Sequence, residues 1–197
     1  MAFTAQDVKK LREMTSVGMM DCKKALQATD GDMEAAIDWL REKGLAKAAK
    51  KADRIAAEGV AYATVIDGVG VVIEVNSETD FAAKTDAFMD LVKNLAVIVA
   101  EQNPADVEAL KACTYPNSNL TVTEIMQEKV MSIGENMVIR RFDRFAENVS
   151  VAYVHAGGTH GVLVNLAVEG DIDATEIGKN VAMQIAAMKA QYWSKDL

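Results

Sequence analysis

The side chains best suited to covalent or metal chemistry are few and scattered in this chain of 197 residues. His155 and His160 lie in a glycine-rich turn, and the two cysteines, Cys22 and Cys113, are isolated. These positions lack the ligand spacing of a zinc site, and the sequence has no phosphate-binding glycine loop of the P-loop type. A cysteine–histidine nucleophile assembled by folding is the remaining enzymatic alternative. We expect a protein that is not an enzyme and that holds no metal or cofactor of its own.

The most unusual polar stretch is the segment 76–81, Asn-Ser-Glu-Thr-Asp-Phe. It joins a predicted strand to a predicted helix, where Thr79 or Asp80 would form the N-cap. One interpretation is a helix cap followed by a core phenylalanine at Phe81. The other is an exposed aromatic beside a carboxylate, able to enter a partner's cleft. The polar stretch is longer than a cap requires, which favours the second interpretation.

Two strands and a long helix must position this segment. Residues 60–66 and 70–76 are β-branched runs joined by Asp67-Gly68, which predicts a hairpin. The helix that follows has an apolar face from Phe88 to Val99 and stops before Pro104.

This strand–strand–helix pattern occurs twice. A shift of 91 positions without gaps pairs residues 60–62 with the identical residues 151–153, and Asp80 with Asp171. Phe81 is replaced by Ile172 in the second copy, so the repeat alone does not require an aromatic there. We expect two similar subdomains, each an antiparallel sheet covered by helices.

The two copies are unequal. The first continues through a helix over residues 123–131 and a third strand over 136–142, and the second has neither. An unpaired sheet edge is a liability. We therefore expect the second half to be completed by another chain or to be truncated.

The first 54 residues predict three helices. Thr4 and Asp7 resemble a capping box, and Val8, Leu11 and Met14 follow as an apolar stripe. The predicted helices are separated by breaks at residues 16–18 and 29–32, and the third runs from Met33 to Glu42, ending at Lys43-Gly44, before a helical linker over residues 45–58. Such small bundles often serve as docking modules.

Met19 and Met20, beside the first break, allow two interpretations. Methionine fills gaps in cores, and it also lines adaptable binding surfaces.

Composition excludes several classes of protein. Half of the residues are apolar and a quarter are charged, which is typical of a folded chain. No apolar run approaches the length of a membrane helix, and the start has no signal peptide. Two cysteines are too few for a disulfide framework, so a reducing cytoplasm is the expected compartment. Residues 1–54 carry 11 basic and 9 acidic side chains, whereas the rest carry 10 and 20. An acidic body disfavours direct nucleic-acid binding.

Three motifs resemble those of the bacterial elongation factor Ts family, and the resemblance covers nearly the whole chain. Residues 11–26 are similar to the family's N-terminal signature, with Ser16-Val17 where Gly-Ala is usual. Residues 74–84 resemble its second signature, with Ala82 where Val is usual. Residues 133–141 resemble a third.

The resemblance implies an α+β fold with three parts: a three-helix bundle of the ubiquitin-associated type with a helical linker (1–54), a first core subdomain (55–145) and an incomplete second one (146–197). It implies a guanine-nucleotide exchange factor that binds elongation factor Tu, promotes Mg²⁺ and GDP release and stabilises the nucleotide-free GTPase. Nucleotide and Mg²⁺ would belong to that partner. The expected location is the cytoplasm, and association into a homodimer stays open.

The resemblance also assigns residues. Those matching partner contacts are Arg12, Met19, Met20, Asp80, Phe81, Ile133 and His155. Those matching the loop linked to magnesium release are Thr79, Asp80, Phe81, Ala82, Ala83 and Lys84. The alternative function is a docking adaptor of the ubiquitin-associated type without exchange activity.

Overall fold

The computed structural model describes residues 3–190 and forms two compact units. The first unit consists of Met1–Ile55 and Thr123–Asn136, and the second consists of Ala56–Val122 and Met137–Leu197. The N-terminal part of the first unit ends at residue 55, whereas the sequence suggested a part that ends at residue 54. The structure groups the helix after residue 122 with the N-terminal helices, whereas the sequence suggested a place among residues 55–145.

Within the described residues, four helices build the first unit: α1 (Ala5–Thr15), α2 (Met19–Ala28), α3 (Met33–Lys51) and α7 (Val122–Ile133). Thr4 caps α1 in a capping box with Asp7, as predicted. The core combines residues from all four helices: Val8, Leu11, Val17, Cys22, Ala25, Leu26, Ala36, Leu40 and Met131. The capping and break signals of α1 and α2 are therefore confirmed.

The third helix does not end at Lys43-Gly44, so that prediction is wrong. α3 runs on to Lys51, and Gly44 is buried in its middle. A Cβ at Gly44 would lie 3.5 Å from Met131 Sδ. The glycine lies at a close packing site between α3 and α7 and does not act as a helix stop.

The second unit contains a three-stranded antiparallel sheet in the order β1-β2-β3, formed by β1 (Glu58–Ile66), β2 (Val69–Ser77) and β3 (Met137–Phe145). A two-residue turn, Asp67-Gly68, joins β1 to β2 with Ile66 opposite Val69. After β2 come the short α4 (Asp80–Ala83), the long α5 (Asp86–Gln102) and α6 (Val107–Ala112). The sequence analysis had not predicted α6.

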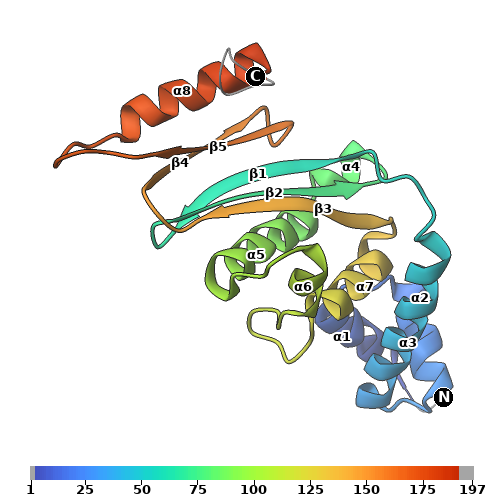
Figure 1. Ribbon diagram of the computed structural model, residues 1–197. Helices are drawn as coiled ribbons and strands as arrows, with labels where there is room; N and C mark the ends of the chain where they lie inside the picture. Colours follow the sequence, from blue (N-terminus) through green and yellow to red (C-terminus); the bar gives the residue numbers. More distant parts are fainter. Residues whose placement is uncertain (1–2, 191–197) are drawn as a thin grey trace. The chain divides into compact units, whose positions relative to one another are not determined.

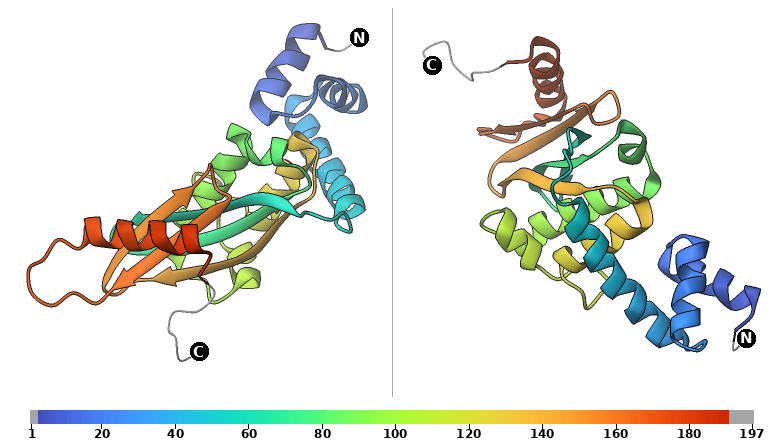
Figure 2. Two further views of the ribbon diagram at one scale, coloured as in Figure 1. Left: turned by 90° about the horizontal axis from the view of Figure 1, so that it is seen from above. Right: turned by 90° about the vertical axis from the view of Figure 1, so that its right-hand side faces the viewer.

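A second, two-stranded sheet consists of β4 (Val149–His155) and β5 (His160–Leu166), and α8 (Thr175–Met188) follows it. Within this unit the elements stack in the order α5, β1–β3, β4–β5, α8 (Figure 1). Seen from above, α8 lies over the β4–β5 hairpin (Figure 2). The unit combines helices with two antiparallel sheets, in agreement with the expected α+β class.

At two glycines, neighbouring layers pack so closely that a side chain on the glycine would not fit. A Cβ on Gly161 of β5 would lie 2.7 Å from the Ala61 carbonyl oxygen of β1. One on Gly178 of α8 would lie 2.6 Å from Val151 Cγ2 of β4. Since real side chains do not come this close, both contacts depend on glycine.

Candidate functional site

The segment after β2 turns sharply, and three hydroxyl groups hold the turn. Ser77, which is fully buried, donates from Oγ to the Thr79 carbonyl oxygen at 2.9 Å. Thr79 is the N-cap of α4, and its Oγ1 accepts from the Ala82 N–H at 3.2 Å. Thr85 donates to the Ala82 carbonyl oxygen at 2.7 Å and caps α5 by accepting from the Phe88 N–H. The prediction of an N-cap at this point is confirmed, with Thr79 as the cap.

Phe81 points out of this turn. Its side chain is 79% exposed, whereas its neighbours Ala82 and Ala83 are buried. Burying a phenylalanine stabilises a fold by about 1.5–3 kcal/mol, so this surface placement forgoes that gain. The core interpretation of Phe81 is wrong. The side chain is held in solvent by a turn whose two small residues face inward.

A charged pair flanks the exposed ring. Lys84 Nζ donates to Asp80 Oδ2 at 2.6 Å, one helical turn away. This hydrogen bond lowers the pKa of the Asp80 carboxyl below its usual value. Asp80 is therefore ionised at neutral pH. The site offers an aromatic ring beside a carboxylate and an ammonium group.

His155 lies at the same end of the second unit as α4. The Gly158 carbonyl oxygen, in the turn after His155, accepts from the Ala61 N–H at 2.8 Å near the start of β1. That part of β1 pairs with the end of β2, which leads into α4 (Figure 1). The exposed His155 ring has Nδ1 2.9 Å from the Tyr153 hydroxyl, and its centroid is 6.0 Å from that of His160. The fold thus gathers Asp80, Phe81 and His155 at one end.

Four other predicted residues belong to the first unit. Arg12 is exposed on α1, and Met19 and Met20 open α2 with 50% and 64% of their surfaces exposed. Ile133, the last residue of α7, is half-buried. The core interpretation of Met19 and Met20 is wrong, and the surface interpretation of these two residues holds.

Met14 was assigned to the buried stripe of α1, but it is 56% exposed. It lies three residues after Leu11, which is buried, so spacing alone gave no signal of its exposure. With Met19 and Met20 it makes three exposed methionines around the α1–α2 connection. Flexible thioether side chains suit an adaptable protein-binding surface.

The described part of the chain offers no group of three or more histidine, cysteine, aspartate or glutamate residues that could hold a metal ion. Both cysteines are free thiols, and burial raises the pKa of Cys22 and of Cys113. Raised pKa values disfavour the thiolate that a nucleophile needs. Among residues 3–190, no helix has the length and hydropathy needed to cross a bilayer.

Comparison with known proteins finds a matching family model and similar proteins. A family model described as elongation factor TS matches residues 78–197. A protein named elongation factor Ts from Magnetococcus marinus is 47% identical over 199 aligned residues. That alignment covers the whole of this chain and 66% of the relative, so the chain spans less than two thirds of the relative's length.

Proposed function

Because the chain belongs to the elongation factor Ts family, we propose that it is a translation elongation factor that binds elongation factor Tu and promotes the release of Mg²⁺ and GDP. One observation carries the proposal: Phe81 is 79% exposed on a turn that hydroxyl caps and buried alanines hold in place. A rigidly presented aromatic ring is suited to enter a cleft in a partner protein.

The mechanism needs no catalytic group. A GTPase holds its nucleotide through Mg²⁺ and donors around the phosphates. A protein that binds the nucleotide-free GTPase more tightly than the loaded form weakens nucleotide binding by the same factor. Each ~1.4 kcal/mol of this coupling changes nucleotide affinity about tenfold. Phe81 would supply part of the coupling by separating partner elements that position Mg²⁺.

The residues around Phe81 form the loop that acts on magnesium in this proposal. It comprises Thr79, Asp80, Phe81, Ala82, Ala83 and Lys84. Thr79, Ala82 and Ala83 stabilise the turn. The charged side chains of Asp80 and Lys84 flank the Phe81 ring. His155 adds a further contact because it lies at the same end of the unit.

The first unit would dock on the nucleotide domain of the partner. Arg12, Met19, Met20 and Ile133 are the proposed contacts. Their support is the exposure of both methionines and of Arg12. We propose that the bundle is of the ubiquitin-associated type, with α7 packed against it.

We also propose that the layered unit is an internal repeat. β1 begins at Glu58 and β4 at Val149, and β2 and β5 begin at Val69 and His160, so both pairs of strands start 91 residues apart. Ile172, 91 residues after Phe81, is likewise exposed, at 67%. The nucleotide and Mg²⁺ would belong to the GTPase, and the factor would act in the cytoplasm.

The test is the release of a fluorescent GDP from elongation factor Tu in the presence of Mg²⁺. We expect the chain to accelerate release, and Phe81→Ala to reduce that acceleration at least about tenfold, which corresponds to ~1.4 kcal/mol of lost coupling. Ile172→Ala is the matched control, because it removes an exposed apolar side chain from the corresponding place in the second half. It should leave the rate unchanged.

Two results would contradict the proposal. Binding without faster release would indicate a docking adaptor. Acceleration that Phe81→Ala leaves unchanged would remove Phe81 from the mechanism while keeping the exchange activity.

A further inference from the structure

Two histidines meet across the β4–β5 hairpin. Their spacing in the sequence did not indicate a metal site, but the strand register places His155 directly opposite His160, next to the turn that joins the strands. Directly opposite residues of an antiparallel pair project to the same face, with Cβ atoms about 4.5–5.5 Å apart. The two ring centroids are 6.0 Å apart, with 61° between the ring planes. The hairpin therefore brings both imidazoles to one place.

Hydrogen bonds determine which ring nitrogen of His160 carries the lone pair. Thr159 donates its hydroxyl hydrogen from Oγ1 to the His155 carbonyl oxygen at 3.2 Å. A hydroxyl has one hydrogen, so the same Oγ1, 3.2 Å from His160 Nδ1, accepts from that nitrogen. His160 Nδ1 therefore carries a hydrogen, and in the neutral ring the lone pair that can bind a metal is on Nε2.

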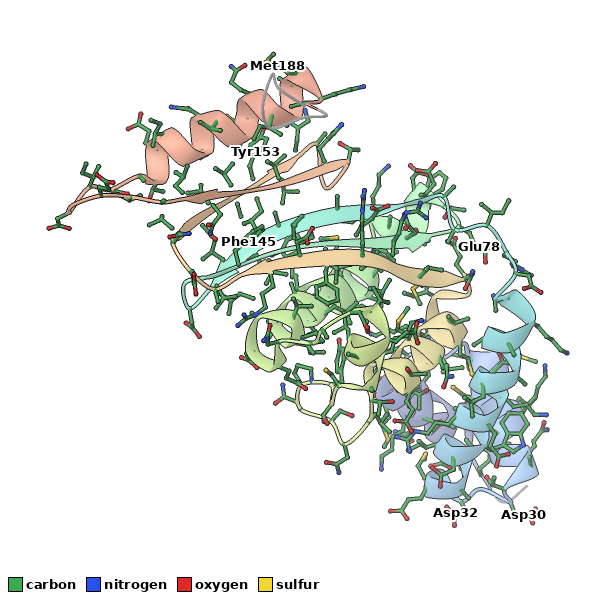
Figure 3. All side chains as sticks on the ribbon, in the orientation of Figure 1. Asp30, Asp32, Glu78, Phe145, Tyr153 and Met188 are labelled. Carbon is green, nitrogen blue, oxygen red and sulfur yellow. The ribbon has the colours of Figure 1, made fainter. Side chains whose placement is uncertain are left out.

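His155 has a similar arrangement. Its Nδ1 lies 2.9 Å from the hydroxyl oxygen of Tyr153, two residues earlier on the same strand. Figure 3 shows Tyr153 between the hairpin and α8. The tyrosine oxygen can accept from Nδ1, which leaves the lone pair of His155 on Nε2 as well. Histidines that bind metals almost always donate their other ring N–H to such an acceptor, which orients the ring and raises its basicity.

The distance between the rings suits one shared ion. With Zn–N bonds of about 2.0–2.1 Å, two imidazoles on one zinc ion have centroids roughly 5 to 5.5 Å apart. The observed 6.0 Å requires only a small side-chain adjustment to reach this range. His155 is exposed and His160 is half-buried, so an ion can reach the pair from solvent.

We propose that His155 and His160 together bind one Zn²⁺ ion through their Nε2 atoms, with water completing the coordination. Imidazole nitrogen suits zinc, whereas Mg²⁺ prefers oxygen ligands. Catalytic and structural zinc sites use three or four protein ligands, so a site with two is weaker and reversible. We expect a dissociation constant on the order of tens of micromolar. The site does not depend on the proposed exchange activity.

The test is a titration of the full chain with ZnCl₂ at neutral pH, followed by the ¹⁵N signals of the histidine side chains. The sequence has two histidines, so both can be observed individually. One zinc ion per chain should shift the Nε2 signals of both rings together, and the same concentration of MgCl₂ should shift neither. Calorimetry gives the affinity. Repeating the titration with Cys113→Ser excludes binding by that half-buried thiol.

Substitutions separate a shared site from two independent ones. His155→Gln and His160→Gln should each weaken zinc binding at least about tenfold, because either change leaves a single ligand. Tyr153→Phe should weaken it about tenfold or more by removing the acceptor from Nδ1. The matched control is Tyr115→Phe, which removes a tyrosine hydroxyl beside Asn94 of α5 and should leave the affinity unchanged. Circular dichroism checks that each variant is folded.

Three results would overturn the proposal. The first is no binding of zinc at concentrations up to about 1 mM. The second is two zinc ions per chain, with each histidine substitution removing one and leaving the affinity for the other unchanged. The third is zinc binding that His160→Gln does not weaken. None of these measurements includes elongation factor Tu, so their outcome is independent of the exchange assay.

Discussion

Phe81 and Phe88 lie seven residues apart in opposite environments, one 79% exposed and the other fully buried. We expect Phe81→Ala to change the free energy of unfolding by less than about 0.5 kcal/mol, as for other surface positions. Phe88→Ala should lower it by about 3–5 kcal/mol, because it leaves a cavity under the sheet. Urea unfolding followed by circular dichroism measures both. A large loss of stability in Phe81→Ala would mean that the ring is packed.

Asp21 offers a pH-dependent prediction. Lys47 Nζ donates to its carboxylate at 2.8 Å, and this hydrogen bond is the main reason why the pKa of Asp21 is lowered. A carboxyl with a lowered pKa in the folded state stabilises the fold above its unfolded pKa of about 3.9, and this stabilisation is lost as the pH falls through the folded pKa. Both side chains are partly exposed, so the pair contributes less than about 1 kcal/mol.

Asp21→Asn should therefore be slightly less stable than the wild type at about pH 7. The difference should begin to shrink below about pH 4 and be lost as the pH falls through the lowered pKa of Asp21. Thermal unfolding from about pH 2 to about pH 7 measures it. Asp53→Asn, an exposed carboxylate of the same unit, is the control. A difference that persists at the acidic end of this range would show that the effect is not electrostatic.

At the residue scale, the sequence predicted the helix N-caps better than it predicted which side chains are exposed. The cap at Thr4 was identified, and the second was narrowed to Thr79 or Asp80, because an N-cap requires a side-chain acceptor at a fixed place. The exposure of Phe81 stayed open because it depends on which residues of the turn face β1 and β2. Met14 was wrongly assigned to the core because helical spacing does not show where the core of a bundle ends.

At the scale of elements, two helical glycines should respond in opposite ways to alanine. A Cβ at Gly178 would clash with Val151, whereas one at Gly44 would make ordinary contacts no closer than 3.5 Å. Gly178→Ala should lower the free energy of unfolding by about 1–3 kcal/mol through overpacking. Gly44→Ala should raise it by up to about 1 kcal/mol through helix propensity. Guanidinium unfolding distinguishes them, and equal signs would contradict the assigned packing.

The elements themselves were largely predictable. The hairpin of β1 and β2, the long α5 and the strand β3 follow from periodicity and turn signals. α6 was missed because its six residues are too few for a helical period to be visible. α3 was cut short because glycine is commonly a stop signal, and only the packing of α7 on Gly44 explains its place inside the helix.

At the scale of the whole molecule, Met131 links distant parts of the sequence. It comes from α7 and is buried in the core of the first unit. Met131→Ala should lower the stability of that unit by about 2–5 kcal/mol. Hydrogen exchange measured by mass spectrometry should show faster exchange in α1 and α3, with β1 and β2 little changed.

Val92→Ala is the control for this prediction, because Val92 is buried in α5 of the second unit. It should speed exchange in β1 and β2 and leave α1 nearly unaffected. Equal responses of both units to either substitution would mean that they unfold together.

Because α7 belongs to the first unit but follows much of the second unit in the sequence, the order of synthesis affects how the first unit folds. The core of that unit needs Met131, which is made 91 residues after Leu40, another member of the same core. At a ribosomal rate of about 5–20 residues per second, the N-terminal helices wait roughly 5 to 20 s for this residue. During that time most of the second unit's first sheet has been made. The two units must therefore mature in an interleaved order on the ribosome, and a pause in translation between them would prolong the exposure of an unfinished helical core.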